Sequence, residues 1–331
     1  MAVTAADVMK LRKMTSAGMM DCKKALEEAA GDFDKAVNII REKGKLVAAK
    51  RADRETSEGA VKARISGGKG ILVALGCETD FVSRTAGFQD LANTIADAAI
   101  EQAPADAEAL MSCKLPDGFT VAEAVEAQTG KTGEKHVIAF YALVEAPFIK
   151  EYIHNLTGKL GALVGFNAEV SDEVAKGIAM QVASMNPVSI SSDDCPQELL
   201  DNELKVAVEK TREEQIQKAV DAALKKAGIN PAHCDSEDHI DSNTAKGWLT
   251  PEQAAQAREI IKTVSAEKAG NLNEQMIQNI AAGRLQKYLK EVTLEAQEYQ
   301  MADGHKTVKE VLAADNSEAK VVVFKRFSFG D

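Results

Sequence analysis

An acidic residue stands beside a bulky aromatic ring at Asp80-Phe81, in a short segment between a glycine-rich apolar run and an amphipathic stretch. An exposed ring at this place could insert between the side chains of another protein. Full burial of such a ring in a partner contributes roughly 1.5–3 kcal/mol. A ring that instead tucks against its own core would have no further role. The pair is therefore a candidate contact site if the ring is exposed, and not if the ring is buried.

The surrounding pattern occurs twice in the chain, and only the first copy contains residues 79–86. In the first copy, the amphipathic stretch begins at Leu91, 13 residues after Glu78. In the second copy it begins at Val174, only 5 residues after Glu169. A duplicated scaffold with one additional loop indicates that the loop has a task beyond folding. Drift of a surface loop by insertion or deletion is the alternative, and it stays open here.

Two consecutive methionines, Met19 and Met20, form a second candidate contact site. A helix cannot bury both on one narrow face, so we expect one of them at the surface. A flexible thioether makes an adaptable contact with another protein. Partial burial of both side chains in a small bundle is the alternative.

The motifs of several common enzyme classes are absent from the sequence. The run from Gly130 to Thr132 resembles the end of a phosphate-binding loop, but Val125 stands where that loop needs a glycine. The glycines at 67, 68 and 70 lack the dinucleotide-binding spacing and favour a hairpin turn. Neither a G-x-S-x-G elbow nor an H-E-x-x-H motif is present. We therefore predict no catalytic residue, no cofactor and no metal site.

One polar segment, residues 228–251, contains side chains that can ligate metals. They are His233, Cys234 and His239, with several aspartates nearby. The segment lacks the glycine that a calcium loop needs at its sixth position, so a solvated acidic tip is the preferred interpretation. The other histidines have no cysteine or second histidine close in sequence; they are His136, His154 and His305.

Composition and charge point to a globular protein. The 331 residues are 45% hydrophobic and 27% charged, with a net charge of −11 that is carried mainly after residue 60. No basic stripe is present, which disfavours a direct nucleic-acid partner. Five scattered cysteines predict reduced thiols in a cytosolic protein. Without a signal segment or a run of membrane-spanning length, we expect a cytoplasmic protein with no membrane partner.

Apolar periodicity and turn residues predict an α+β fold with a duplicated core. Three short helices, the last ending at Gly44, should form an N-terminal bundle before a charged linker. Each core half should contain a strand hairpin followed by a helix, and residues 321–329 should return to the second sheet. An antiparallel helical hairpin is inserted into the second half. The predicted ranges are 1–45 for the bundle, 46–58 for the linker, 59–139 for the first core half, 140–188 and 292–331 for the second, and 189–291 for the hairpin.

Several motifs together resemble the family of bacterial translation elongation factor Ts. Near the N-terminus, Leu11-Arg12 is followed by TSAGMMDCKKAL at 15–26 and by Gly31-Asp32. The second signature is CETDFV at 77–82. The C-terminal pattern comprises Gly283-Arg284 with Tyr288, Lys306-Thr-Val308, and Phe324-Lys-Arg-Phe327. Two signatures of this length, in this order, are highly specific, and the similarity covers nearly the whole chain.

The resemblance implies a guanine-nucleotide exchange factor for the GTPase elongation factor Tu. It implies a ubiquitin-associated-like N-terminal bundle, a duplicated strand-hairpin/helix core and a dimerisation-type helical hairpin. The segment that would displace magnesium consists of Thr79, Asp80, Phe81 and Val82. The ring of Phe81 would wedge between side chains of the GTPase.

Further partner contacts follow from the same resemblance. The residues implied on the N-terminal bundle are Arg12, Met19, Met20 and Lys23. His154 matches a histidine of the second core hairpin, although the turn that follows it, at 155–158, differs in length. The sequence stops at Asp331, so the terminal helical module of some members is expected to be missing.

A reading from another functional class remains as the alternative. A non-catalytic adaptor or holding chaperone would bind a partner through the bundle and the helical hairpin without changing nucleotide release. The sequence also leaves open a homodimer through the hairpin, because polar helical hairpins pack within one chain as well as between chains.

Overall fold

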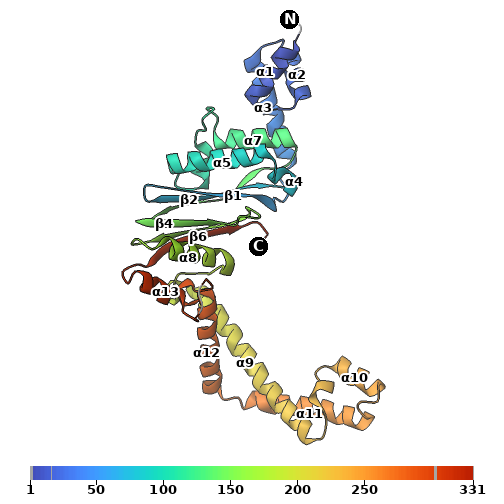
Figure 1. Ribbon diagram of the computed structural model, residues 1–331. Helices are drawn as coiled ribbons and strands as arrows, with labels where there is room; N and C mark the ends of the chain where they lie inside the picture. The colour runs from blue at the N-terminus through green and yellow to red at the C-terminus, as the bar shows by residue number, and fades with distance from the viewer. Residues whose placement is uncertain (1–2, 16, 302–303, 331) are drawn as a thin grey trace. The chain divides into compact units, whose positions relative to one another are not determined.

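The computed structural model describes residues 3–15, 17–301 and 304–330. The chain folds into two compact units: Met1–Ile190 together with Gln297–Asp331, and Ser191–Ala296. Helices and two small antiparallel sheets make up the fold, which confirms the α+β class (Figure 1).

The N-terminal bundle consists of α1 (Ala5–Thr15), α2 (Met19–Glu28) and α3 (Phe33–Lys50). Leu11, Leu26 and Ala36, one from each helix, are fully buried in its core. Asp32 caps α3, because its carboxylate accepts a hydrogen bond from the backbone N–H of Lys35 at 3.1 Å. Residue Ser16, in the predicted break between the first two helices, lies outside the described residues.

Helix α3 continues to Lys50, so the prediction that Gly44 ends this helix was wrong, and residues 46–50 of the predicted linker are helical. Gly44 is buried where α3 packs against α7 (Val121–Thr132). A Cβ added to Gly130 of α7 would lie 3.0 Å from the Cα of Gly44. The two backbones therefore approach too closely for side chains, and the glycine serves helix packing instead of helix termination.

The first sheet contains β1 (Glu58–Ser66), β2 (Lys69–Cys77) and β3 (Val137–Glu145), antiparallel and in that order. Gly67 and Gly68, both with positive φ, make the predicted turn between β1 and β2. Because β3 pairs with β2, with Leu72 opposite Ala142, the predicted boundary at 139/140 assigned this strand to the wrong half. Its apolar pattern fits either sheet, so the sequence does not identify its neighbour.

Four helices connect β2 to β3 and cover one face of this sheet. They are α4 (Asp80–Ser83), α5 (Ala86–Gln102), α6 (Ala107–Ser112) and α7. Ile71 and Val73 of β2 pack in one cluster with Phe88 and Ile95 of α5. The helix predicted from about residue 88 to 103 is confirmed in α5.

The second sheet contains β4 (Phe148–Ile153), β5 (Leu160–Phe166) and β6 (Val321–Ser328). Strand β6 pairs with β5, which confirms the predicted return of the chain to this sheet. The predicted helix at 172–185 is present as α8 (Asp172–Met185), and α13 (Val308–Asp315) precedes β6. Each sheet is thus built from a hairpin, a helical connection and a third strand.

The two sheets pack against each other through an apolar layer (Figure 1). Val61 and Leu72 of the first sheet share this layer with Ile149 and Leu163 of the second. Strand β2 is buried on both faces, because its alternate side chains face the helices and the second sheet. Its continuous apolar run reflects this central position.

The second unit is helical, with α9 (Gln197–Lys226), α10 (Glu237–Ala245), α11 (Pro251–Gly270) and α12 (Glu274–Val292). Short 3₁₀ turns occur at Ser192–Asp194, Pro231–His233 and Leu294–Ala296. Both α11 and α12 pack on α9, so the return arm of the predicted hairpin is interrupted between them.

The tip of this unit, residues 228–251, folds around a small apolar core, and its acidic residues are exposed, as expected for a solvated acidic tip. Ile229, Ile240 and Leu249 are buried there together with Leu224 of α9. These apolar residues are too far apart in sequence to form a helical or strand pattern, so only the fold shows that they converge. Cys234 is buried in the same cluster.

Candidate partner-binding site

Helix α4 is a single helical turn that presents the ring of Phe81 to solvent. Phe81 is 83% exposed, whereas Val82 is half-buried and Ser83 is buried. Val82 packs on the core cluster between the first sheet and the helices that cover it. The flanking residues thus fix the turn, and the ring is available to another protein instead of being tucked against its own core.

Hydrogen bonds tie the start of this turn to the segment before β3. The backbone N–H of Thr79 donates to Glu134 Oε2 at 3.1 Å, and Thr79 Oγ1 donates to Glu134 Oε1 at 2.7 Å. The Cys77 thiol donates to the Thr79 carbonyl oxygen at 3.2 Å, and Ser83 Oγ donates to the Asp80 carbonyl oxygen at 3.1 Å. The backbone of the turn is therefore tied to the segment before β3.

Glu78, directly before this turn, holds a second set of contacts. Arg51, at the C-terminal end of α3, donates to its two carboxylate oxygens at 3.0 and 2.9 Å, and the backbone N–H of Lys135 donates at 2.7 Å. These contacts, the Lys135 N–H first and the Arg51 guanidinium second, hold the pKa of Glu78 below its ordinary value.

Sequence reasoning missed Arg51, Glu134 and Lys135, because nothing in their spacing links them to the turn. Arg51 lies within the range predicted as a linker, where a charged side chain is expected to be exposed to water and to have no partner. The one available signal was Glu78 itself, which stands within the CETDFV signature.

Asp80 has a looser environment than Glu78. Its carboxylate forms an ion pair with Arg84 at 3.0 Å, one helical turn later, and the Arg84 side chain is largely exposed. Exposed pairs of this spacing are weak, of the order of 0.3–0.5 kcal/mol. The carboxylate of Asp80 can therefore leave Arg84 for a stronger cation at little cost.

The thiol nearest the turn, that of Cys77, is fully buried. Burial first, and then the carboxylates of Glu134 and Glu58, raise the pKa of Cys77 to about 12. A thiol in this state stays protonated at neutral pH and reacts poorly.

On the N-terminal bundle, the structure exposes every residue named as a contact. Met19 and Met20 are 51% and 63% exposed, so both methionines reach the surface, not just one. Lys23 follows one turn later on α2 and pairs weakly with Glu27 at 3.8 Å. Arg12 is exposed on α1. Because Lys23 lies four residues after Met19 and three residues after Met20 on the same helix, its side chain neighbours both methionines on the surface.

His154 begins the turn between β4 and β5. Its Nδ1 lies 3.1 Å from Thr157 Oγ1. At the end of the turn, Lys159 forms an ion pair with Glu58, which stands opposite Cys77 in the β1–β2 ladder. The turn containing His154 therefore lies at the same end of the core as the segment carrying Phe81.

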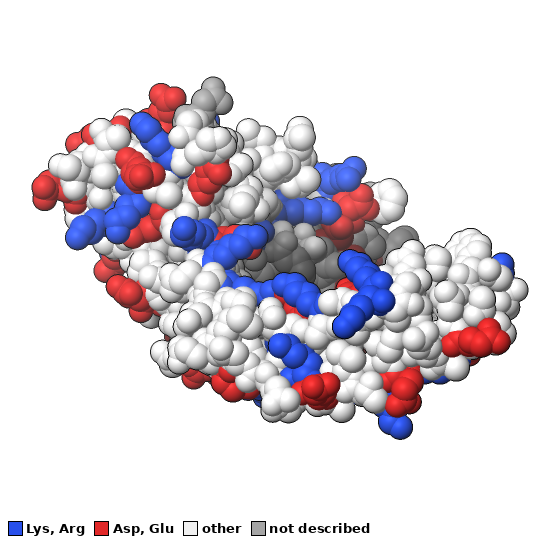
Figure 2. All heavy atoms as spheres, turned by 90° about the horizontal axis from the view of Figure 1, so that it is seen from below, with Lys and Arg blue, Asp and Glu red and all other residues white. Residues whose placement is uncertain are grey.

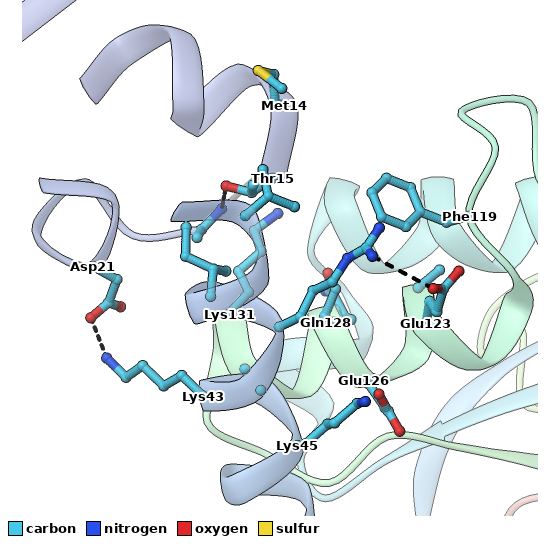
Figure 3. Close-up of a pocket in the computed structure, with 18 of the residues that line it drawn as sticks. Met14, Thr15, Asp21, Lys43, Lys45, Phe119, Glu123, Glu126, Gln128 and Lys131 are labelled. Carbon is cyan, nitrogen blue, oxygen red and sulfur yellow. Dashed lines mark hydrogen bonds and ion pairs between the residues drawn. The ribbon is translucent and has the colours of Figure 1, made fainter. Parts of the chain in front are cut away.

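A cavity of about 710 Å³ lies between α3 and the helices α5 and α7 (Figure 3). On one side, Lys43 forms an ion pair with Asp21. On the other, the Arg41 guanidinium lies 4.6 Å from the centre of the Phe119 ring and pairs with Glu123 at 3.8 Å. The Lys43–Asp21 pair joins α3 to α2 within the bundle, whereas the Arg41 contacts hold the bundle against α7 and the segment before it.

Within residues 3–15, 17–301 and 304–330, no group of three His, Cys, Asp or Glu side chains is arranged to hold a metal. His233, one of the sequence candidates, has its ring 5.5 Å from that of Trp248 instead.

Among the helices that the structure describes, none combines the length and apolarity needed to cross a bilayer. Figure 2 shows one face of the molecule, where basic and acidic side chains both occur. Charge on that face does not identify one class of partner.

Comparison with known proteins adds independent evidence. A family model described as "Elongation factor TS" matches residues 78–331. Elongation factor Ts of Bacteroides fragilis is 56% identical over 328 residues, which cover 99% of each chain. The protein of that name from Bacteroides thetaiotaomicron is 53% identical with the same coverage, and the one from Porphyromonas gingivalis is 37% identical over 99% of this chain and 98% of the relative. This chain therefore belongs to the elongation factor Ts family.

Proposed function

We propose that this protein is a cytoplasmic guanine-nucleotide exchange factor that binds elongation factor Tu, displaces its magnesium ion and promotes GDP release during translation elongation. The observation that carries this proposal is the exposed ring of Phe81 on a turn whose backbone is tied to the core. Membership of the elongation factor Ts family supports the choice of partner. The factor itself performs no covalent chemistry in this process.

The proposed contact segment is Thr79, Asp80, Phe81 and Val82. The Phe81 ring enters between side chains of the GTPase near its magnesium site, and Asp80 brings a carboxylate close to the ion. Magnesium requires near-ideal octahedral oxygen geometry, so a small displacement of its ligands weakens its binding. Because Thr79 is held by Glu134, the GTPase deforms rather than the turn.

The energetic requirement exceeds what one ring supplies. A factor that prefers the nucleotide-free GTPase weakens nucleotide binding by the same ratio, and each tenfold ratio needs about 1.4 kcal/mol. A thousandfold effect needs about 4 kcal/mol, whereas burying one phenyl ring contributes about 1.5–3 kcal/mol. Other surfaces must therefore bind at the same time.

The exposed residues of the N-terminal bundle supply the first of these surfaces. In this proposal the bundle acts as a ubiquitin-associated-like docking module for the nucleotide-binding domain of the GTPase. Its contacts are Arg12, Met19, Met20 and Lys23. His154, at the same end of the core as Phe81, adds a contact from the second hairpin.

The helical unit Ser191–Ala296 is proposed to mediate self-association. Light scattering at two concentrations of the full-length protein measures this directly. If the measured mass equals that of one chain at both concentrations, self-association is refuted. The proposed exchange activity does not depend on that result.

The deciding experiment for exchange is stopped-flow release of fluorescent GDP from purified elongation factor Tu, with and without this protein. We expect release to accelerate as the factor concentration rises and then to saturate. A non-catalytic adaptor or chaperone would bind the GTPase, detectable by calorimetry, and leave the release rate unchanged. That result would refute the exchange function.

A further inference from the structure

A buried histidine lies directly behind the segment that holds the Phe81 turn. His136 is only 7% exposed, and its ring centre lies 5.6 Å from that of Phe88 on α5. Its backbone N–H donates to Thr129 Oγ1 of α7 at 3.2 Å. The proposed contact site does not include this histidine, because its ring has no access to another protein. Any effect on the site must therefore pass through neighbouring residues of its own chain.

The imidazole fixes the backbone of Glu134. His136 Nδ1 lies 2.9 Å from the Glu134 carbonyl oxygen, and because a carbonyl oxygen only accepts, Nδ1 carries the proton and donates. On the other side of the same residue, the Glu134 N–H donates to Thr132 Oγ1 at 3.1 Å. Both backbone polar groups of Glu134 are thus engaged, and its carboxylate accepts the two hydrogen bonds from Thr79.

Lys135, the next residue, extends these contacts. Its backbone N–H donates to Glu78 at 2.7 Å. Its Nζ donates to the carbonyl oxygens of Ala52 and Arg54, just after α3, at 2.6 and 2.9 Å. The segment thus contacts both the start of the turn and the chain that leads from the bundle. Because His136 is the buried end of this segment, the position of these contacts depends on how firmly its imidazole is held.

The surroundings of the ring favour the neutral imidazole. His136 Nε2 is buried and has no hydrogen-bond partner among the residues that the structure describes. Helices α5 and α7 face the ring with Phe88 and Thr129, which carry no charge. Burial, the largest effect, lowers the pKa of His136 below its ordinary 6.5, although Glu134 and Glu78 act in the opposite direction. A proton on Nε2 would create a buried donor without an acceptor.

We propose that His136 is a positioning residue for nucleotide exchange: its neutral imidazole fixes Glu134, whose carboxylate then holds Thr79 at the start of the turn. This inference rests on the proposed function and adds a residue that does not touch the GTPase. The opened segment accepts a proton on the ring more readily than the closed one. The contribution of the neutral ring is therefore complete above pH 6.5 and decreases as the pH falls below that value.

Hydrogen exchange of the free full-length protein, followed by mass spectrometry, tests this positioning without the GTPase. Peptides that cover residues 77–83 report opening of the turn. His136→Phe keeps a ring and loses both nitrogens, whereas His136→Asn keeps an N–H donor at the position of Nδ1. At neutral pH, after correction for intrinsic exchange rates, we expect the turn to open about tenfold more often in His136→Phe than in wild type. His136→Asn should lie much closer to wild type.

The order of the two variants distinguishes positioning from simple core packing. Phenylalanine keeps the contact with Phe88, whereas asparagine removes the ring and leaves space in the core. If His136 only filled the core, His136→Asn would open the turn more often than His136→Phe, and that order would overturn the proposal. Global unfolding in urea is the reference measurement, and there we expect His136→Asn to be the less stable variant.

The pH dependence of the same exchange data is the second readout. Lowering the pH from about 7.5 to about 5.5 should raise opening of the wild-type turn by up to about tenfold. Neither variant should show this rise, because neither replacement side chain titrates. His239→Phe is the matched control: it removes an exposed imidazole that pairs with Asp235 in the helical unit, and it should keep the wild-type response. An equal response of wild type and His136→Phe would refute the proposal.

Stopped-flow release of fluorescent GDP from elongation factor Tu connects this positioning with exchange. We expect His136→Phe to lower the rate at saturating factor about tenfold, because a misplaced turn acts poorly on the GTPase. The half-saturating concentration should change much less, since the bundle contacts lie elsewhere, and His136→Asn should recover most of the rate. If the turn opens in His136→Phe and the saturated rate stays that of wild type, the positioning role is refuted. If wild type itself fails to accelerate release, the proposed function is wrong, and hydrogen exchange still decides whether His136 holds the turn.

Discussion

The guanidinium of Arg51 bridges both carboxylate oxygens of Glu78, with its Nη1 at 3.0 and 2.9 Å from them. Arg51 ends the helix that carries the N-terminal bundle, and Glu78 directly precedes the turn that carries Phe81. The pair therefore joins the two surfaces that are proposed to bind the GTPase. With the Lys135 N–H on the same carboxylate, it sets the position of one surface relative to the other.

Replacing Glu78 by Gln should lower the free energy of unfolding by about 1–2 kcal/mol at neutral pH, because a charged acceptor of three hydrogen bonds becomes a neutral one. The pKa of Glu78 is lower in the folded than in the unfolded protein, so its contribution is complete above the ordinary value of 4.5 and is lost as pH falls through the lowered value. Urea unfolding at several pH values measures the difference.

Glu145→Gln is the control for this substitution. Glu145 pairs with Lys69 at 3.4 Å, and both side chains are exposed. Its removal should cost only a few tenths of a kcal/mol. If both variants lost the same free energy of unfolding at every pH, the Glu78 contacts would contribute no more stability than an exposed ion pair.

Replacing Phe81 by Ala should slow stimulated GDP release about 10–100-fold, because the ring is exposed and acts only when buried in the partner. Complex formation should weaken much less, since the bundle still binds. Stopped-flow release and calorimetry on the same preparations give the two quantities. Val206→Ala, at an exposed site of α9, is the control for loss of surface apolar area. Small and equal effects of Phe81→Ala on release and binding would rule out the wedge.

Replacing Asp80 by Asn should reduce stimulated GDP release, and the deficit should grow as free magnesium rises. The substitution removes the carboxylate proposed to compete for the ion and keeps the side-chain shape. Release rates measured over a magnesium titration, for wild type and variant, give the dependence. Parallel curves for the two proteins would show that Asp80 has no part in magnesium displacement.

Replacing Gly130 by Val should force α3 away from α7, because even a Cβ at this position would lie 3.0 Å from the Gly44 Cα. We expect a loss of about 1–3 kcal/mol and faster proteolysis between residues 45 and 58. Gly283→Val in α12 is the control, since a Cβ there meets no atom within 4 Å. Equal protease resistance of the Gly130 variant and wild type would mean that the close crossing does not hold the bundle.

Replacing Ile240 by Ala should destabilise the tip of the helical unit by about 2–5 kcal/mol, because Ile240 is 1% exposed in its apolar cluster. Trp248, the single tryptophan of the chain, lies in the same tip and reports its unfolding by fluorescence. Val206→Ala should leave the transition unchanged. If the Trp248 fluorescence of Ile240→Ala showed the same unfolding transition as wild type, this cluster would not stabilise the tip.

Local patterns in the chain were sufficient for several features. The CETDFV signature and the shorter second copy singled out the turn at Phe81, and the spacing of Met19 and Met20 indicated an exposed methionine. The helix at 172–185 and the return strand at 321–329 also followed from periodicity. Such features depend on residues within one or two turns of each other, so the order of residue types along the chain specifies them.

Other features arise only when distant segments meet. Arg51 and Glu78 are separated by a strand hairpin, and Gly44 acts as a packing site only because Gly130 reaches it from another helix. The pairing of β3 with β2 also depends on residues that are far apart in the sequence. Each depends on the sum of many weak long-range contacts, which no short window of sequence contains. Motifs thus located the candidate site, and hydrogen bonds between remote elements tie it to the core.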